Sequence, residues 1–181
     1  MDQRNRTLLY GGAVITPDGP RYDWAVLIEG PKILAVGPFR FVKSYKKDER
    51  RIYVRGRIIA PGFVDVQING AARHLLTGEP NVATVRAMAN VLPCFGCTGF
   101  LPTVITAPIE RMEAAARAVA AVMAEPTNGA RILGIHLEGP FINPERAGAH
   151  QRDAILAPSV DVLHRLWEAS DGNIRLLTLA P

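Results

Sequence analysis

The segment Gly134-Ile135-His136-Leu137-Glu138-Gly139-Pro140 combines a short apolar strand with two ionisable side chains. His136 and Glu138 fall on the same face because side chains alternate along a strand. Glu138 comes at the strand end and is followed by Gly-Pro, which turns the chain sharply. A carboxylate placed there is suited to bind a divalent metal, and Zn²⁺ takes Glu oxygens at about 2.0–2.2 Å. We therefore predict Glu138 as a metal ligand rather than as a structural ion-pair partner.

His136 lies one residue pair deeper in the same strand. We expect a buried histidine that packs behind the site rather than binding the metal itself. The loop that follows, residues 141–155, brings a second histidine, His150, directly after Gly148-Ala149. Small residues let the backbone approach a ligand, and the ring of His150 could donate to a substrate carbonyl or hydroxyl. An exposed loop histidine without a function is the alternative.

An earlier strand, Phe63–Gln67, places Asp65 and Gln67 on one face together with Asn69 just beyond its end. Three polar groups cannot be buried in a dry core without partners. They must therefore pair with each other, closing the mouth of a barrel, or bind a ligand. Of the remaining histidines, His164 is predicted on the surface of a helix, and His74 lies in a loop without an assigned role.

The elements that must hold these side chains change in character near residue 57. Short strands broken by turns come first and predict a small antiparallel β domain over residues 1–57. Strands and helices then alternate over residues 58–181, which favours a parallel sheet buried on both faces. No glycine-rich phosphate loop opens the first helix, so a (β/α) barrel is preferred over an open doubly wound sheet. The predicted strands are Thr7–Ile15, Trp24–Ile28, Lys32–Val36, Arg51–Val54, Phe63–Gln67, Gly99–Ile105, Ile132–Leu137 and Ile174–Leu179, and the predicted helices are Pro80–Leu92, Thr106–Ala124 with Thr106 as N-cap, and Ser159–Ala169.

The bulk composition is that of an ordinary globular α/β protein, with 48% apolar and 21% charged residues. No apolar stretch is long enough for a membrane span or a signal peptide, which predicts a cytoplasmic protein without a membrane partner. Residues 40–57 carry eight Lys/Arg against two acidic residues. A solvated hairpin explains this run better than a nucleic-acid site, because no aromatic-and-basic pattern of a nucleic-acid module accompanies it. The Cys94-Phe-Gly-Cys97 pair lacks the helix N-terminal setting of a redox site and a second pair for zinc.

Three motifs in order, PGFVDVQING, FGCTGFLPTVIT and GIHLEGPFINPERAGAH, resemble N-acetylglucosamine-6-phosphate deacetylases of the amidohydrolase superfamily. The resemblance runs to the last residues of the chain. It implies an α/β protein, namely a partial (β/α)₈ TIM-type barrel of about four strands preceded by a small β-sandwich-type domain. It also implies a bound divalent metal such as zinc, a homodimer for the whole protein, and hydrolysis of the acetamide of N-acetylglucosamine 6-phosphate to glucosamine 6-phosphate and acetate.

By the same resemblance, Glu138 matches a metal ligand, whereas Ala149 and His150 match positions that contact the phosphosugar substrate. Gln67 and Asn69 replace the His-x-His metal pair of many amidohydrolases and, like His136, are expected behind the metal ligand. Amides are poor ligands for a second metal, so one principal metal is expected. After Asn69-Gly70 the family has a glycine-rich stretch, whereas this chain reads Ala-Ala-Arg-His-Leu-Leu.

The family's two further metal-binding histidines and catalytic aspartate fall on later strands and are expected beyond Pro181, so the resemblance implies no catalytic residue within this chain. A metal held by one carboxylate would bind weakly, since catalytic zinc takes three protein ligands. Three hypotheses follow: an incomplete piece of the deacetylase that is inactive alone, a non-catalytic half-barrel that pairs with another chain, or a related amidohydrolase acting on another amide.

Overall fold

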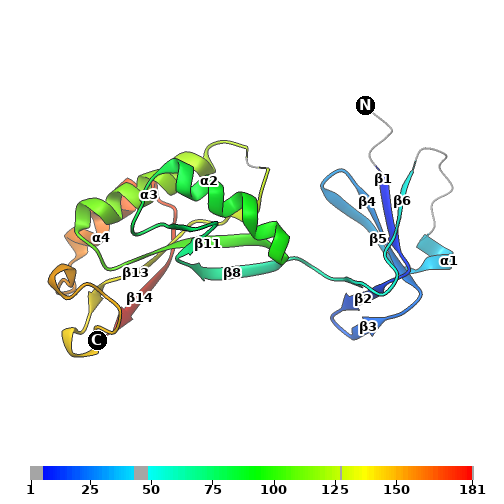
Figure 1. Ribbon diagram of the computed structural model, residues 1–181, viewed down its shortest axis with the longest axis horizontal. Helices are drawn as coiled ribbons and strands as arrows, with labels where there is room; N and C mark the ends of the chain where they lie inside the picture. The colour runs from blue at the N-terminus through cyan, green and yellow to red at the C-terminus, as the bar shows by residue number, and fades with distance from the viewer. Residues whose placement is uncertain (1–5, 43–48, 127, 181) are drawn as a thin grey trace. The chain divides into compact units, whose positions relative to one another are not determined.

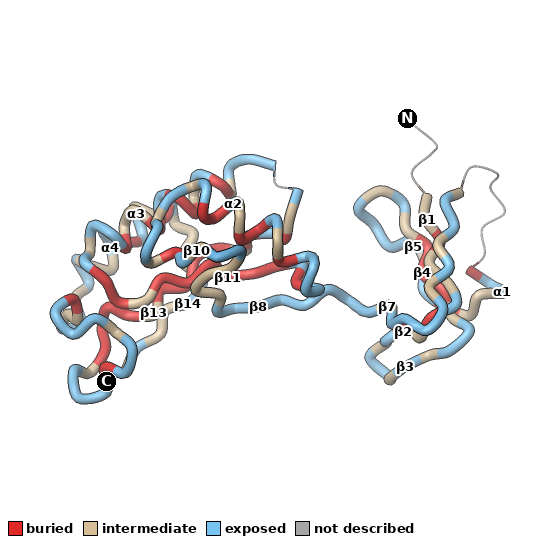
Figure 2. Tube along the Cα trace, in the orientation of Figure 1, coloured by how far each residue is buried: buried red, intermediate tan, exposed pale blue. Residues whose placement is uncertain are grey.

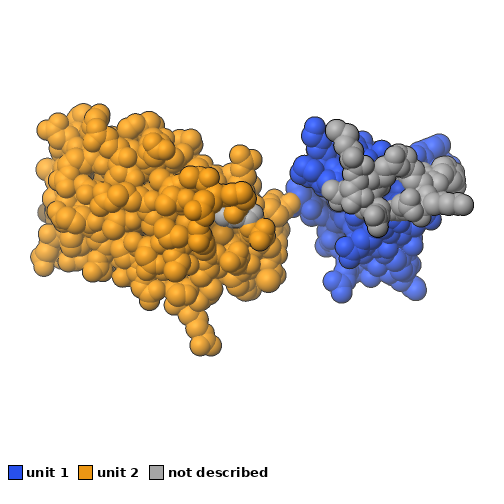
Figure 3. All heavy atoms as spheres, turned by 90° about the horizontal axis from the view of Figure 1, so that it is seen from above, with its two compact units in different colours: residues 1–61 blue, residues 62–181 orange. Residues whose placement is uncertain are grey.

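The computed structural model describes residues 6–42, 49–126 and 128–180. The chain forms two compact units, Met1–Pro61 and Gly62–Pro181, which Figure 3 colours separately. The predicted domain boundary between residues 57 and 58 stays a prediction. In the structure, residues 58 and 59 pair with a strand of the first unit.

The first unit is built almost entirely of strands. One sheet has the order β5-β4-β1-β6 and a smaller one the order β3-β2-β7. Pairing is antiparallel except where β6 joins β1 and β7 joins β2. A small core of Leu8, Ala25, Leu27 and Val42 holds the larger sheet. The elements are β1 (Arg6–Tyr10), β2 (Ala13–Thr16), β3 (Gly19–Arg21), β4 (Trp24–Glu29), β5 (Lys32–Pro38), α1 (Phe39–Val42), β6 (Arg50–Tyr53) and β7 (Ile58–Ile59).

Two sequence-based expectations for this unit were wrong. The strand predicted over residues 7–15 is broken at Gly11, whose φ of +84° favours glycine and whose Cβ position lies 2.1 Å from the ring of Tyr53. The basic run contains the short helix α1 where a hairpin was expected, and the guanidinium of Arg40 lies 4.6 Å from the ring centre of Phe41. Lys43, Lys46, Lys47 and Asp48 of this run lie outside the described residues.

The second unit confirms the predicted α/β fold. Its main strands pair in parallel, in the spatial order β8, β11, β13, β14, and form a curled sheet that corresponds to part of a barrel (Figure 1). Strand β12 also pairs with β11, nearer the start of β11 than β13 does. Leu133-Gly134 separate β12 from β13. The elements are β8 (Phe63–Ile68), β9 (Gly70–Ala71), β10 (His74–Leu75), α2 (Val82–Val91), η1 (Leu92–Phe95), β11 (Cys97–Ile105), α3 (Ile109–Met123), β12 (Arg131–Ile132), β13 (Ile135–Ile142), η2 (Pro144–Arg146), η3 (Arg152–Ala154), α4 (Val160–Ala169) and β14 (Ile174–Ala180).

The core of this unit lies between the helices and the central strands. Figure 2 shows β11 and β13 as buried and β8 as exposed along its length. Helix α3 contributes Met112, Val119 and Val122 together with three alanines, and small side chains let it lie close to the sheet. Phe100 of β11 is the largest of the fully buried side chains among the described residues. The two central strands, β11 and β13, are therefore the most buried strands of this unit.

The two cysteines lie in η1 and at the first residue of β11. Cys94 is exposed in η1, whereas Cys97 is buried and its thiol lies 3.2 Å from the carbonyl oxygen of Gly99. Both are free thiols. Within the described part of the chain, no helix is long and apolar enough to cross a membrane.

Candidate functional site

The carboxyl ends of β8 and β11, together with Glu138 in the middle of β13, bring together several of the predicted site residues. Glu138 pairs in register with Ile105, the last residue of β11, and its side chain is half-buried. Asn69, the residue after β8, donates from Nδ2 to Oε2 of Glu138 at 3.4 Å. This contact joins side chains 69 positions apart in the sequence. A carboxylate and an amide thus meet beside the ends of β8 and β11. The expectation that Glu138 ends its own strand was wrong, because β13 continues through Gly139-Pro140 to Ile142.

The other polar residues of β8 do not join this contact. Asp65 accepts a hydrogen bond from the backbone N–H of Gln67 at 3.0 Å, so its carboxylate is held by its own strand. Both Asp65 and Gln67 are exposed. Alternation placed these residues together on one face, but only Asn69 reaches the strand-end carboxylate.

His136 is buried among the central strands, 1% exposed. Its Nδ1 lies 3.2 Å from the hydroxyl of Thr103 on β11, and its Nε2 lies 2.8 Å from the hydroxyl of Thr178 on β14. Burial lowers the pKa of His136 below its ordinary value, although the nearby charge of Glu138 opposes this change. The ring therefore links β13 to both of its neighbours, β11 and β14.

Thr106 corrects one expectation. It was predicted to cap the helix after β11, but α3 begins at Ile109 and its N-cap position is Pro108, which makes no side-chain cap. The hydroxyl of Thr106 instead lies 2.8 Å from Nδ1 of His150 and 3.5 Å from the backbone oxygen of Glu138. Sequence reasoning missed this role, and the available signal was its position directly after a buried strand.

The loop after β13 places His150 beside Thr106, and Ala149 is exposed next to it. The backbone N–H of His150 bonds to the oxygen of Ala147 at 2.9 Å, and Gly148 between them has a φ of +53°. The structure thus holds His150 against β11 and, through Thr106, against the backbone of Glu138.

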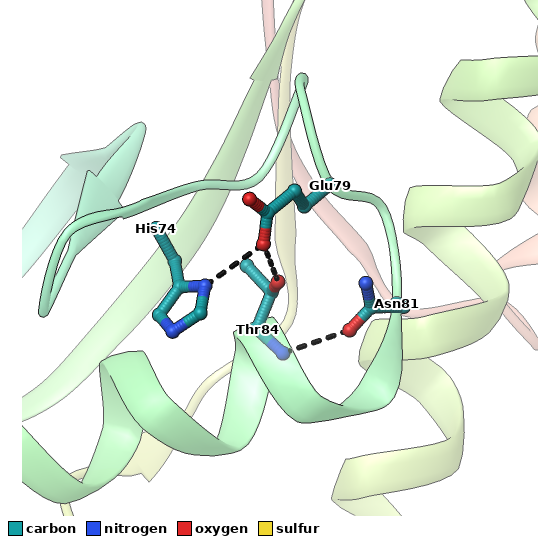
Figure 4. A network of polar contacts seen from close by, with 4 residues as sticks. All are labelled: His74, Glu79, Asn81 and Thr84. Atoms are coloured by element: carbon teal, nitrogen blue, oxygen red, sulfur yellow. Dashed lines mark hydrogen bonds and ion pairs between the residues drawn. The ribbon is translucent and has the colours of Figure 1, made fainter.

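The segment that replaces the family's glycine-rich stretch forms a two-residue hairpin between β9 and β10. Ala72 and Arg73, which connect the strands, both have positive φ, 53° and 67°. His74 lies just beyond, with Nδ1 2.9 Å from Oε2 of Glu79 (Figure 4). The hydrogen bond from His74 is the main reason that the pKa of Glu79 lies below its ordinary value. His74 therefore supports the loop before α2 and takes no part in the strand-end contacts that the structure describes.

A metal ion would find one carboxylate at these strand ends. Within the described residues, no group of three His, Cys, Asp or Glu side chains could hold a metal. A catalytic zinc ion takes three protein ligands. The residues present therefore do not make a complete metal site, and at most contribute Glu138 to one.

Two known proteins, one similar in sequence and one similar in structure, share one described activity. Human N-acetylglucosamine-6-phosphate deacetylase is 35% identical over 98% of this chain. The crystal structure of the Pasteurella multocida deacetylase matches 96% of the chain with a TM-score of 0.84 and 28% identity. The chain resembles the N-terminal part of N-acetylglucosamine-6-phosphate deacetylases. The resemblance inferred from the three motifs is thereby confirmed.

The match to the deacetylases covers this chain almost completely but covers only part of each deacetylase. The chain spans 42% of the length of the human relative and 44% of the Pasteurella structure. An N-acetylgalactosamine-6-phosphate deacetylase from Shewanella is 40% identical over 70% of the chain, and the match spans 31% of that relative. No family model matches the chain.

Proposed function

We propose that this chain supplies one wall of a metal-dependent deacetylase site that acts on the acetamide of N-acetylglucosamine 6-phosphate. The observation that carries the proposal is the meeting of Asn69, Glu138, Thr106 and His150 beside the carboxyl ends of β8 and β11. Strand ends are where barrels of this kind place their chemistry. Deacetylases similar to this chain over nearly its whole length support the choice of reaction.

Glu138 is the proposed metal ligand. Its carboxylate is half-buried and is held from the side by the amide of Asn69. Such a contact orients a ligand without competing for the ion. A bound divalent metal such as zinc would polarise the amide carbonyl and lower the pKa of water. The other ligands and the catalytic aspartate would have to come from residues outside this sequence, so the chain alone is proposed to be inactive.

Ala149 and His150 are the proposed contacts to the substrate. The exposed backbone of Ala149 is open to a ligand, and the ring of His150 is fixed by Thr106. Gln67 and His136 are proposed in supporting positions. His136 holds β13 between its neighbours, whereas Gln67 is exposed beside the strand end.

A chimera tests the proposal directly. Residues 1–181 would replace the matching N-terminal part of the human deacetylase, whose own remainder supplies the missing ligands. Release of acetate from N-acetylglucosamine 6-phosphate is expected in the chimera, but not with the 181-residue chain alone. Glu138→Gln should reduce turnover in the chimera to background because a neutral amide replaces the ligand.

Glu145→Gln is the matched control, since Glu145 is an exposed carboxylate in the loop after β13. It should leave turnover unchanged. Full activity of the chain alone, or an active Glu138→Gln chimera, would contradict the proposed role of Glu138.

The Shewanella relative supports a second candidate, deacetylation of N-acetylgalactosamine 6-phosphate. Comparing kcat/KM of the chimera for the two phosphosugars decides between them. A third candidate, a non-catalytic half-barrel that pairs with another chain, is favoured by the exposed Phe63, Val64 and Val66 on β8. Light scattering distinguishes it, because a stable monomer would count against it. A homodimer for the whole protein and a cytoplasmic location stay predictions.

A further inference from the structure

Thr106 lies where the loop after β13 meets the end of β11. Its side chain is 1% exposed. The hydroxyl oxygen lies 2.8 Å from Nδ1 of His150 and 3.5 Å from the backbone oxygen of Glu138. The space around it is tight, because a Cβ built on Gly139 would come 2.1 Å from that oxygen. The hydroxyl is thus enclosed between one imidazole nitrogen and one carbonyl oxygen.

The single proton of this hydroxyl couples the two contacts. A backbone carbonyl oxygen only accepts, so the 3.5 Å contact requires Thr106 to donate to Glu138. The hydroxyl oxygen must then accept at the 2.8 Å contact, and Nδ1 of His150 must carry the proton. In the opposite arrangement Thr106 donates to Nδ1, and the contact to Glu138 is lost. Only the first arrangement makes both hydrogen bonds.

We infer that Thr106 is a positioning residue that holds neutral His150 as its Nδ1–H tautomer. The other ring nitrogen, Nε2, then carries a lone pair. It accepts a hydrogen bond in the neutral ring and donates one only when the ring is protonated. This step rests on the proposed function. Neutral His150 would accept a hydrogen bond from a hydroxyl group of the sugar, whereas a contact to the acetamide carbonyl oxygen requires the imidazolium.

Nuclear magnetic resonance of the 181-residue chain tests the tautomer without substrate, metal or activity. Long-range ¹H–¹⁵N correlations of the histidine rings distinguish Nδ1–H from Nε2–H. Spectra would be recorded near pH 8.5, well above the ordinary histidine pKa of about 6.5. His150→Gln identifies the signals of this ring among the four histidines. Nδ1–H is expected to dominate, although the free side chain prefers Nε2–H, and a dominant Nε2–H form would overturn the inference.

Two variants separate positioning from a general structural effect. Thr106→Ser keeps the hydroxyl and should keep the Nδ1–H form, whereas the isosteric Thr106→Val should release His150 toward Nε2–H. His136 is the internal control, since its ring bonds to Thr103 and Thr178 instead. Equal changes at His136 and His150, or no change at His150, would reject the positioning role. An inactive chimera with the expected tautomer would instead count against the proposed function alone.

Discussion

Gly139 offers the sharpest test of how the strand end is packed. Its φ is +103°, a conformation that L side chains rarely adopt. A Cβ there would also lie 2.1 Å from Oγ1 of Thr106 and 3.3 Å from a carbon of Ile142. Gly139→Ala therefore carries two separable penalties, one from the backbone and one from the contact with Thr106.

The two penalties have similar expected sizes. A residue forced into an unfavourable φ costs about 1–3 kcal/mol, and an extra methyl group in a packed site costs about 1–3 kcal/mol. Gly139→Ala should thus lower the free energy of unfolding by about 2–6 kcal/mol. Thr106→Ala removes the oxygen at 2.1 Å and leaves the milder contact with Ile142 at 3.3 Å, so in that background mainly the backbone penalty of about 1–3 kcal/mol should remain.

A double-mutant cycle measures the difference. Urea unfolding followed by circular dichroism at 222 nm reports on the second unit, because every helix of ten or more residues in the described chain lies there. The four proteins are the unmodified chain, Gly139→Ala, Thr106→Ala and the double variant. We expect a coupling free energy of about 1–3 kcal/mol.

Equal costs of Gly139→Ala in both backgrounds, within about 0.5 kcal/mol, would refute this account of the packing. The penalty would then come from the backbone alone. A changed dependence on urea concentration would show instead that the unfolded or native state had altered in compactness.

Three further changes should alter stability in predictable directions. Because burial lowers the pKa of His136, the unfolded chain binds the proton more readily. The second unit should therefore lose stability as pH falls below the ordinary histidine value of about 6.5, and His136→Gln should flatten this loss in urea titrations at pH 5 and 7.5. Ser159→Ala removes the cap at which Oγ accepts from the N–H of Val162 at 3.3 Å; thermal unfolding should show a loss of about 1 kcal/mol, which Ser159→Asp should largely avoid. Arg73→Gly relieves a φ of +67° and should stabilise the chain by about 0.5–1 kcal/mol in the same assay.

Local sequence patterns were enough to predict the platform of the site. The apolar runs that became β11 and β13 are buried along nearly their whole length, so their period and their glycine and proline boundaries reflect the fold directly. The position of Glu138 followed from the same run. The contact between Asn69 and Glu138 was predicted only in part. Alternation shows which side chains share a face, but not the register in which neighbouring strands pair.

Thr106 shows why the rest could not be predicted. A threonine three residues before an apolar helical pattern suggests an N-cap. Pro108 takes that position instead, so the hydroxyl of Thr106 is left for other partners. Those partners lie 32 and 44 residues further along the chain. Their approach depends on the path of the loop after β13, which no local pattern specifies.

The contacts around Glu138 orient this residue but do not complete a metal site. Its side chain is held by Asn69 from β8, and its backbone oxygen is held by Thr106 after β11. Asn69 therefore holds the carboxylate and Thr106 holds the backbone of the same residue, whereas within the described residues no group of three His, Cys, Asp or Glu side chains could hold a metal ion. In the proposed site, Glu138 is one ligand of an ion whose other ligands come from elsewhere. There, the contacts from Asn69 and Thr106 would orient Glu138 toward the ion.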